Sequence, residues 1–233
     1  MYCGIYAPWD HVPKFLRYAE VMNPLVPVMY FFDANDVEGH EEKLKTWRHF
    51  VVTDAYFNDA RFGPGSLIFD YEQNVRLVEA LYLLSLDRDD APNKVNQITE
   101  EQLATERAEW VWFPVELTEK ELLDPYVPIK AAFEELQLQQ FRDHLSEWLN
   151  AALSIDAVDE YMSAGEIIMV YDHLKKMYSA AWLIFQRDTE RTQYKDKTRR
   201  ARESSDCPDG KQGELEEEET DNIDGETNDS ISL

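Results

Sequence analysis

Cysteine is scarce in this chain of 233 residues, with Cys3 and Cys207 near opposite ends. Two cysteines so far apart form no CxxC motif and offer no metal-binding spacing, which favours two unpaired thiols over a disulfide framework. Long hydrophobic runs are also lacking, since no stretch reaches the ~18 apolar residues of a membrane-spanning helix. The first 15 residues lack the basic segment and apolar core of a secretory signal. We therefore expect a cytoplasmic protein that does not enter membranes.

Recognisable catalytic and metal-binding motifs are lacking as well. The sequence contains no HExxH, GxSxG or GxxxxGK[ST] pattern, which are typical of zinc proteases, α/β-hydrolases and phosphate-binding loops. Its five histidines do not form the paired Glu-x-x-His motifs of a di-iron helical bundle. The acidic segment 33–42 has glycine one position too late for a calcium-binding loop. The sequence therefore predicts no cofactor, no metal site and no identifiable catalytic residue.

Basic residues are few, with 23 Lys and Arg against 47 Asp and Glu and a net charge of −24. Residues 1–186 alone contain 32 acidic and 15 basic residues, a net of −17, so the C-terminal segment does not explain all of the charge. A body this acidic repels a phosphate backbone, which argues against nucleic-acid binding by the folded part. The charge suits solubility or a basic protein partner.

An internal duplication is the most informative feature that is present. Residues 9–86 match residues 110–186 at an offset of 101, which becomes 100 after one deleted loop residue. The matched positions include large aromatic side chains, among them Trp47 with Trp148 and Tyr71 with Tyr171. Each segment of secondary structure can therefore be predicted from two sequences rather than one.

The duplication resolves the secondary structure of an ambiguous segment. Residues 26–32 contain strand-favouring residue types, whereas the matching residues 127–135 favour a helix. Both follow an N-capping residue and a proline, which is a helix-start signal, so we predict a helix in each. Apolar spacings of three and four residues predict further helices in both copies, over residues 38–57, 66–86, 136–153 and 166–189.

These elements predict an all-α chain built by tandem duplication of a three- to four-helix unit, with the two units packed about a pseudo-two-fold axis. The first unit covers residues 1–90 and the second residues 106–194. Residues 91–105 form a polar linker and the start of a connecting helix, where Thr99 and Gln102 match a capping box. Residues 195–233, basic and then acidic with few large apolar side chains, are expected to be a disordered tail.

Candidate interaction residues are the repeated aromatic pairs and the basic run at the start of the tail: Trp47, Tyr71, Trp148, Tyr171, Arg199, Arg200 and Arg202. Aromatic side chains on an apolar helix face fill a core or line a groove between the units. The basic run can contact a partner, or it can be neutralised by the acidic run at residues 214–219.

Three functions are consistent with these observations. The first is a non-enzymatic interaction or regulatory protein that presents an acidic helical surface or an inter-unit groove to a protein partner. The second is an enzyme with its site at the interface of the two units. Its candidate residues would be polar positions that differ between the copies: Arg48, His49, Asp54, Arg142, Asp143 and His144. The third is an acidic DNA-mimic inhibitor of a nucleic-acid-binding enzyme, with carboxylates spaced like phosphates.

Overall fold

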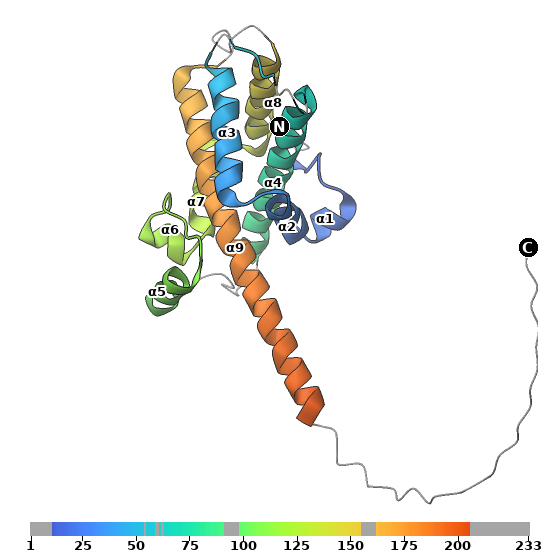
Figure 1. The fold of residues 1–233 in the computed structure, drawn as a ribbon, viewed down its shortest axis with the longest axis vertical. Coiled ribbons are helices and arrows are strands. Elements are labelled where there is room, and N and C mark those ends of the chain that lie inside the picture. The colour runs from blue at the N-terminus through green and yellow to red at the C-terminus, as the bar shows by residue number, and fades with distance from the viewer. Residues whose placement is uncertain are drawn as a thin grey trace, which may run out of the picture. The chain divides into compact units, whose positions relative to one another are not determined.

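Helices are the only regular secondary structure in the part of the chain that the structure describes (Figure 1). The computed structural model describes residues 11–53, 55–58, 61, 63–90, 98–154 and 162–205, with the backbone alone at 87–90 and 190–205. Backbone contacts divide the chain into one unit over residues 1–192 and another over residues 193–233. Each of these units is described separately.

The helices of the two sequence copies follow one another in the same order. The first copy forms α1 (Tyr18–Met22), α2 (Leu25–Ala34), α3 (Val37–Val51) and α4 (Pro64–Asp90). The connecting helix is α5 (Glu100–Glu109). The second copy forms α6 (Glu119–Leu123), α7 (Tyr126–Glu135), α8 (Leu138–Leu153) and α9 (Ala164–Ser205). The prediction of an all-α chain is confirmed, whereas the pseudo-two-fold relation between the copies stays a prediction.

Local capping signals explain where several of these helices begin. The predicted helices at residues 26–32 and 127–135 are present as α2 and α7. The N-cap positions of α2 and α7 are the prolines themselves, Pro24 and Pro125, rather than the residues before them. Asp124, just ahead of the α7 N-cap, accepts a hydrogen bond from the backbone N–H of Tyr126 at 3.1 Å. Thr99 and Gln102 form the predicted capping box of α5, in which each side chain accepts from the backbone N–H of the other residue.

Three predicted helix ends differ from the structure. Helix α4 ends at Asp90 rather than at residue 86. Helix α3 ends at Val51 rather than at residue 57, because three consecutive β-branched residues, 51–53, disfavour continuation of the helix. Phe57 instead donates its backbone N–H to the carbonyl of Ala152 at the end of α8. Helix α9 continues to Ser205, past the predicted tail start at residue 195. No glycine or proline interrupts residues 190–205, and residues 206–233 lie outside the described residues.

One hydrophobic core joins both sequence copies within residues 1–192. Its fully buried members include Phe31 and Leu44 from the first copy and Phe141 and Leu145 from the second. Near the starts of α4 and α9, Leu67 and Ile167 are buried, whereas their neighbours Ile68 and Ile168 are exposed. Among the described helices, none is both long enough and apolar enough to cross a membrane.

Candidate functional site: the groove between α1, α2 and α4

The repeated tryptophans meet each other in the core. The rings of Trp47 and Trp148 lie 5.7 Å apart in an edge-to-face arrangement, and the indole N–H of Trp47 donates to the Trp148 carbonyl at 3.2 Å. Both side chains are buried. They were expected as candidate interaction residues, but in this structure they fill the seam between the copies, because aromatic pairs of this geometry favour a dry core.

The repeated tyrosines lie at the edges of the same seam and are half-buried. Tyr71 contacts the Trp47 ring edge-on at 6.5 Å, and burial raises the pKa of its hydroxyl. The guanidinium carbon of Arg48 lies 3.8 Å from the centre of the Tyr171 ring, a cation–π contact. The third group of interaction candidates, Arg199, Arg200 and Arg202, lies on α9 where side chains are not described.

The polar residues proposed for an enzyme site have different partners rather than a common one. Arg142 pairs with Glu79 at 2.7 Å, and Asp143 accepts a hydrogen bond from Gln139 at 2.7 Å. His144 faces Glu147 at 3.5 Å. His49 is exposed, its ring 5.4 Å from that of Phe50, and Asp54 lies outside the described residues. Within the described residues, no cluster of three or more His, Cys, Asp or Glu could hold a metal ion.

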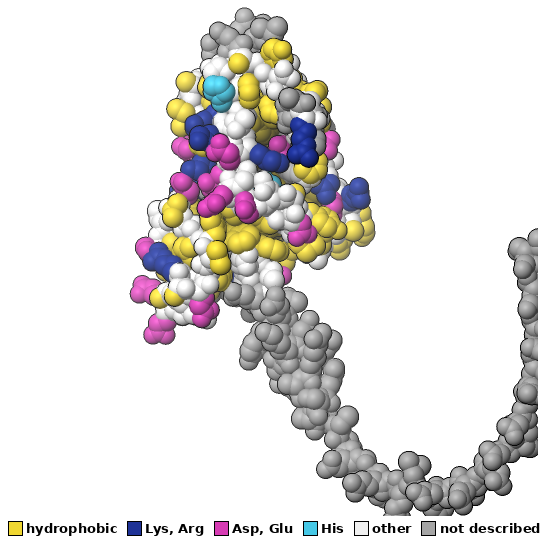
Figure 2. All heavy atoms as spheres, in the orientation of Figure 1, with side chains coloured by type: hydrophobic (Ala, Val, Ile, Leu, Met, Phe, Trp, Pro, Cys, Tyr) yellow, Lys and Arg dark blue, Asp and Glu magenta, His cyan; other side chains and the backbone are white. Residues whose placement is uncertain are grey.

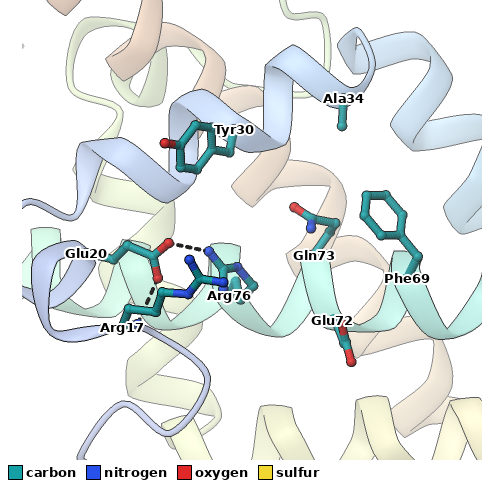
Figure 3. Close-up of a pocket in the computed structure, with 8 residues that line it drawn as sticks. All are labelled: Arg17, Glu20, Tyr30, Ala34, Phe69, Glu72, Gln73 and Arg76. Carbon is teal, nitrogen blue, oxygen red and sulfur yellow. Dashed lines mark hydrogen bonds and ion pairs between the residues drawn. The ribbon is translucent and has the colours of Figure 1, made fainter.

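A solvent-open groove of about 420 Å³ lies between the start of α1, α2 and α4 (Figure 3). We call it the α1–α2–α4 groove; its walls are Arg17, Glu20, Tyr30, Ala34, Phe69, Glu72, Gln73 and Arg76. Figure 3 shows Tyr30 on α2 above the Glu20–Arg76 pair, with Arg17 beside that pair, and Phe69 on α4 at the opposite end of the groove, beyond Gln73. The groove therefore has Tyr30 and the two arginines at one end, which we call the basic end, and Phe69 at the other.

The Glu20 carboxylate holds the basic end in place. It accepts the backbone N–H of Arg17 at 2.8 Å and pairs with the Arg76 guanidinium at 2.5 Å. The second copy keeps this arrangement, since Glu121 pairs with Lys176 at 2.8 Å. Burial alone would raise the pKa of Glu121, but the hydrogen bonds from Lys176 and Thr118 lower it. This repeated ion pair could have been found from Arg76 and Lys176, which lie 100 positions apart.

Two residues that line the groove differ from their counterparts in the second copy. At the corresponding positions of the second copy, Glu135 and His173 lie 3.1 Å apart and link α7 to α9. The first copy has Ala34 and Gln73 there, and both line the groove. The sequence difference was visible, but only the structure shows that both positions line a hollow.

A second hollow of about 360 Å³ continues from Phe69 toward the start of α4. Lys43 and Asp70, which pair at 2.7 Å, form one wall. Burial raises the pKa of the Asp70 carboxyl, and its hydrogen bond from Lys43 opposes this effect. Because Phe69 belongs to both hollows, they form a continuous strip along the first residues of α4.

Large apolar side chains are exposed beside this strip. Tyr18 and Met22 on α1, Tyr30 on α2 and Phe69 on α4 are all exposed. Figure 2 shows hydrophobic side chains gathered across the lower part of the visible face of the body, where α1 and α2 lie in Figure 1. Such gathered exposure is typical of an interaction surface.

The sequence carried a signal for this surface, because the second copy has different residues there. Glu119 and Ala131 stand at the positions of Tyr18 and Tyr30.

Comparison of the chain with protein-family models, with curated proteins and with solved structures gave no match.

Proposed function

We propose that this chain is a non-enzymatic interaction or regulatory protein that binds a protein partner through the α1–α2–α4 groove. The observation that carries the proposal is the pair of exposed aromatic side chains, Tyr30 and Phe69, which line a hollow of about 420 Å³ together with Arg17 and Arg76. Aromatic residues and arginine are the residue types that contribute most binding energy at protein interfaces.

The chemistry of the groove supports binding rather than catalysis. Its strongest polar contact, between Glu20 and Arg76, has the same form in the second copy, as expected of a contact that stabilises the fold. Arg17 and Gln73 have Thr118 and His173 as counterparts, whereas Glu72 keeps its charge as Asp172. No nucleophile with an adjacent base lines the groove. The net charge of −17 over residues 1–186 favours a partner with a basic surface.

Quantitative affinity capture from the native host tests this proposal. The bait is the full chain, compared with the variant Tyr30→Ser/Phe69→Ser. The matched control, Val111→Ser/Val115→Ser, removes two exposed apolar side chains that lie away from the groove. We expect one captured protein to fall about tenfold with the groove variant and to stay unchanged with the control.

Circular dichroism must show that both variants keep the helical content of the parent chain. A captured protein whose yield is the same for all three baits would contradict the proposal, as would the absence of any protein enriched over an inert acidic bait.

A further inference from the structure

Arg17 is a cation at the basic end of the groove that the fold does not neutralise. Its side chain is exposed, and within the described residues its guanidinium makes neither an ion pair nor a hydrogen bond (Figure 3). The neighbouring guanidinium of Arg76 pairs with Glu20 and also donates to the Phe15 carbonyl at 3.3 Å. The two arginines share one carboxylate, so this end of the groove has one positive charge in excess.

The backbone around Arg17 is fixed although its guanidinium is unpaired. The N–H groups of residues 14, 15 and 16 donate to the Glu79 carboxylate at 2.8, 2.8 and 3.2 Å, and the N–H of Arg17 donates to Glu20 at 2.8 Å. Both carboxylates are buried. A ligand that pairs with Arg17 would therefore meet a cation on an ordered backbone, which lowers the ordering cost of binding.

A single carboxylate matches the charge at this end of the groove. Arginine binds a carboxylate through two parallel N–H···O bonds, and one negative charge balances the excess beside Glu20. A phosphate group carries about −1.5 to −2 charges and would leave an excess of negative charge. The other carboxylate that lines the groove, Glu72, points away from Arg17 and Arg76 in Figure 3, so it does not neutralise them.

The length of the groove sets the spacing of the groups that it can bind. Phe69 and Arg76 are seven positions apart on α4, which is about 10 Å along the helix axis. An extended segment covers that length with about three residues. The second hollow continues from Phe69, so a bound segment can run on past this end, as an internal part of a chain does.

We propose that the α1–α2–α4 groove binds a partner segment in which an Asp or Glu side chain pairs with Arg17. A large apolar side chain about three positions away packs against Phe69. The inference rests on the proposed function and names the chemistry of the segment that occupies the groove. The rest of the partner surface is basic, because the net charge of −17 attracts over a longer range than the local pair.

A nuclear magnetic resonance titration of the nitrogen-15-labelled full chain tests the proposal. The probe is the peptide acetyl-Glu-Ser-Ser-Leu-amide, and the control probe has Gln in place of Glu. Each peptide is titrated into the parent chain, into Arg17→Gln and into the control Lys120→Gln. Lys120 is an exposed lysine of α6 outside the groove, so both variants make the same change in net charge.

We expect the Glu peptide to bind the parent and Lys120→Gln chains about threefold more tightly than the Gln peptide, as expected of an exposed ion pair. Without a specific contact the order would be reversed, because the acidic chain repels the Glu peptide. In Arg17→Gln the preference for Glu should disappear. The amide resonances of Arg17 and Phe69 should shift during the titration, and circular dichroism should show that both variants are folded.

Several results would overturn the inference. One is a Glu peptide that binds the parent chain no more tightly than the Gln peptide, and another is a preference for Glu that survives in Arg17→Gln. A third is the absence of any shift at Phe69 with either peptide. Tighter Arg17-dependent binding of a Gln peptide with a free terminal carboxylate would assign the site to a chain end. The same result with a phosphoserine peptide would assign it to a phosphate.

The proposed function is tested separately by capture of the host partner. If Tyr30→Ser/Phe69→Ser lowers that capture while the peptides show no preference for Glu, the groove binds a partner without a carboxylate on Arg17. Capture that is unchanged by the groove variant contradicts the proposed function itself.

Discussion

Glu79 and Arg142 are buried charges that tie the N-terminal segment to both sequence copies. The Glu79 carboxylate accepts the backbone N–H groups of Lys14, Phe15 and Leu16 at 2.8, 2.8 and 3.2 Å. It also accepts a hydrogen bond from Nε of Arg142 at 2.8 Å, and Nη2 of Arg142 donates to the Val12 carbonyl at 2.6 Å. Every one of these contacts is long-range in sequence, so no local pattern could have predicted them.

Replacement of Arg142 by methionine should destabilise the chain by about 3 kcal/mol, because the Glu79 charge would stay buried without its cation. Urea denaturation measures the change. The neighbouring Asp143→Asn, at an exposed position on the same helix, should change the free energy of unfolding by less than about 0.5 kcal/mol. Equal effects of the two substitutions would show that the ion pair contributes little.

The buried imidazole of His40 predicts a pH-dependent stability. Nε2 of His40 donates to the Phe31 carbonyl at 2.7 Å, and the ring stacks on Phe31 at 3.7 Å. Burial lowers the His40 pKa to about 4 from 6.5. Between these values the unfolded chain binds a proton that the folded chain does not, so stability falls as the pH decreases from 6.5 toward 4, by up to about 1.4 kcal/mol per pH unit.

Urea midpoints at pH 7 and pH 5 test this prediction. The difference between the two midpoints should shrink in His40→Gln and stay unchanged in His49→Gln, which alters an exposed histidine. If both variants keep the slope of the parent chain, protonation of His40 does not oppose folding.

At the scale of helices, α5 depends on a tertiary anchor more than on its own sequence. It has only ten residues, and isolated helices this short are marginal in water. Arg187→Met removes the cation that holds buried Glu106 and should raise amide hydrogen exchange across α5 at least about tenfold. The control Thr105→Ala changes an exposed position of α5 and should not. Equal exchange in the two variants would mean that the apolar contacts of Leu103 alone hold α5.

Helix starts could be predicted from the sequence, whereas helix ends and hollows could not. The Thr99 capping box of α5 and the prolines at the starts of α2 and α7 are local signals. The duplication also shows the same proline at the start of both α2 and α7. The β-branched residues 51–53 are only a weak signal for the end of α3, and the contact of Phe57 with the distant Ala152 carbonyl has no local signal. The groove is lined by side chains from three helices, and their relative positions cannot be predicted from a local pattern.

For the whole molecule, the shared core predicts that residues 1–192 unfold as one cooperative unit. Trp47 and Trp148 contact each other across the seam, and Tyr178 of the second copy donates a hydrogen bond to Asn74 of the first. Neither copy can therefore expose its core alone. Tryptophan fluorescence and far-ultraviolet circular dichroism should give coincident urea transitions. Two separated transitions would show that the copies fold independently.

The aromatic pairs had two interpretations from the sequence, core or inter-unit groove, and the structure favours the core for Trp47 and Trp148. Identity between copies marked positions needed for folding. The surface proposed for binding lies where the copies differ, at Tyr18, Tyr30 and Ala34. The difference in residue type between the copies is visible in the sequence. Whether those side chains are exposed could not be predicted, because exposure depends on neighbours from other helices.

Site-specific photo-crosslinking in the native host tests the central claim most directly. A photoreactive phenylalanine analogue replaces Tyr30 in the α1–α2–α4 groove or, as a control, exposed Val111. Our account predicts that position 30 crosslinks to one host protein and that position 111 does not. Crosslinks from position 111 to the same protein with equal yield, or none from position 30, would contradict the assignment of this groove as the binding surface.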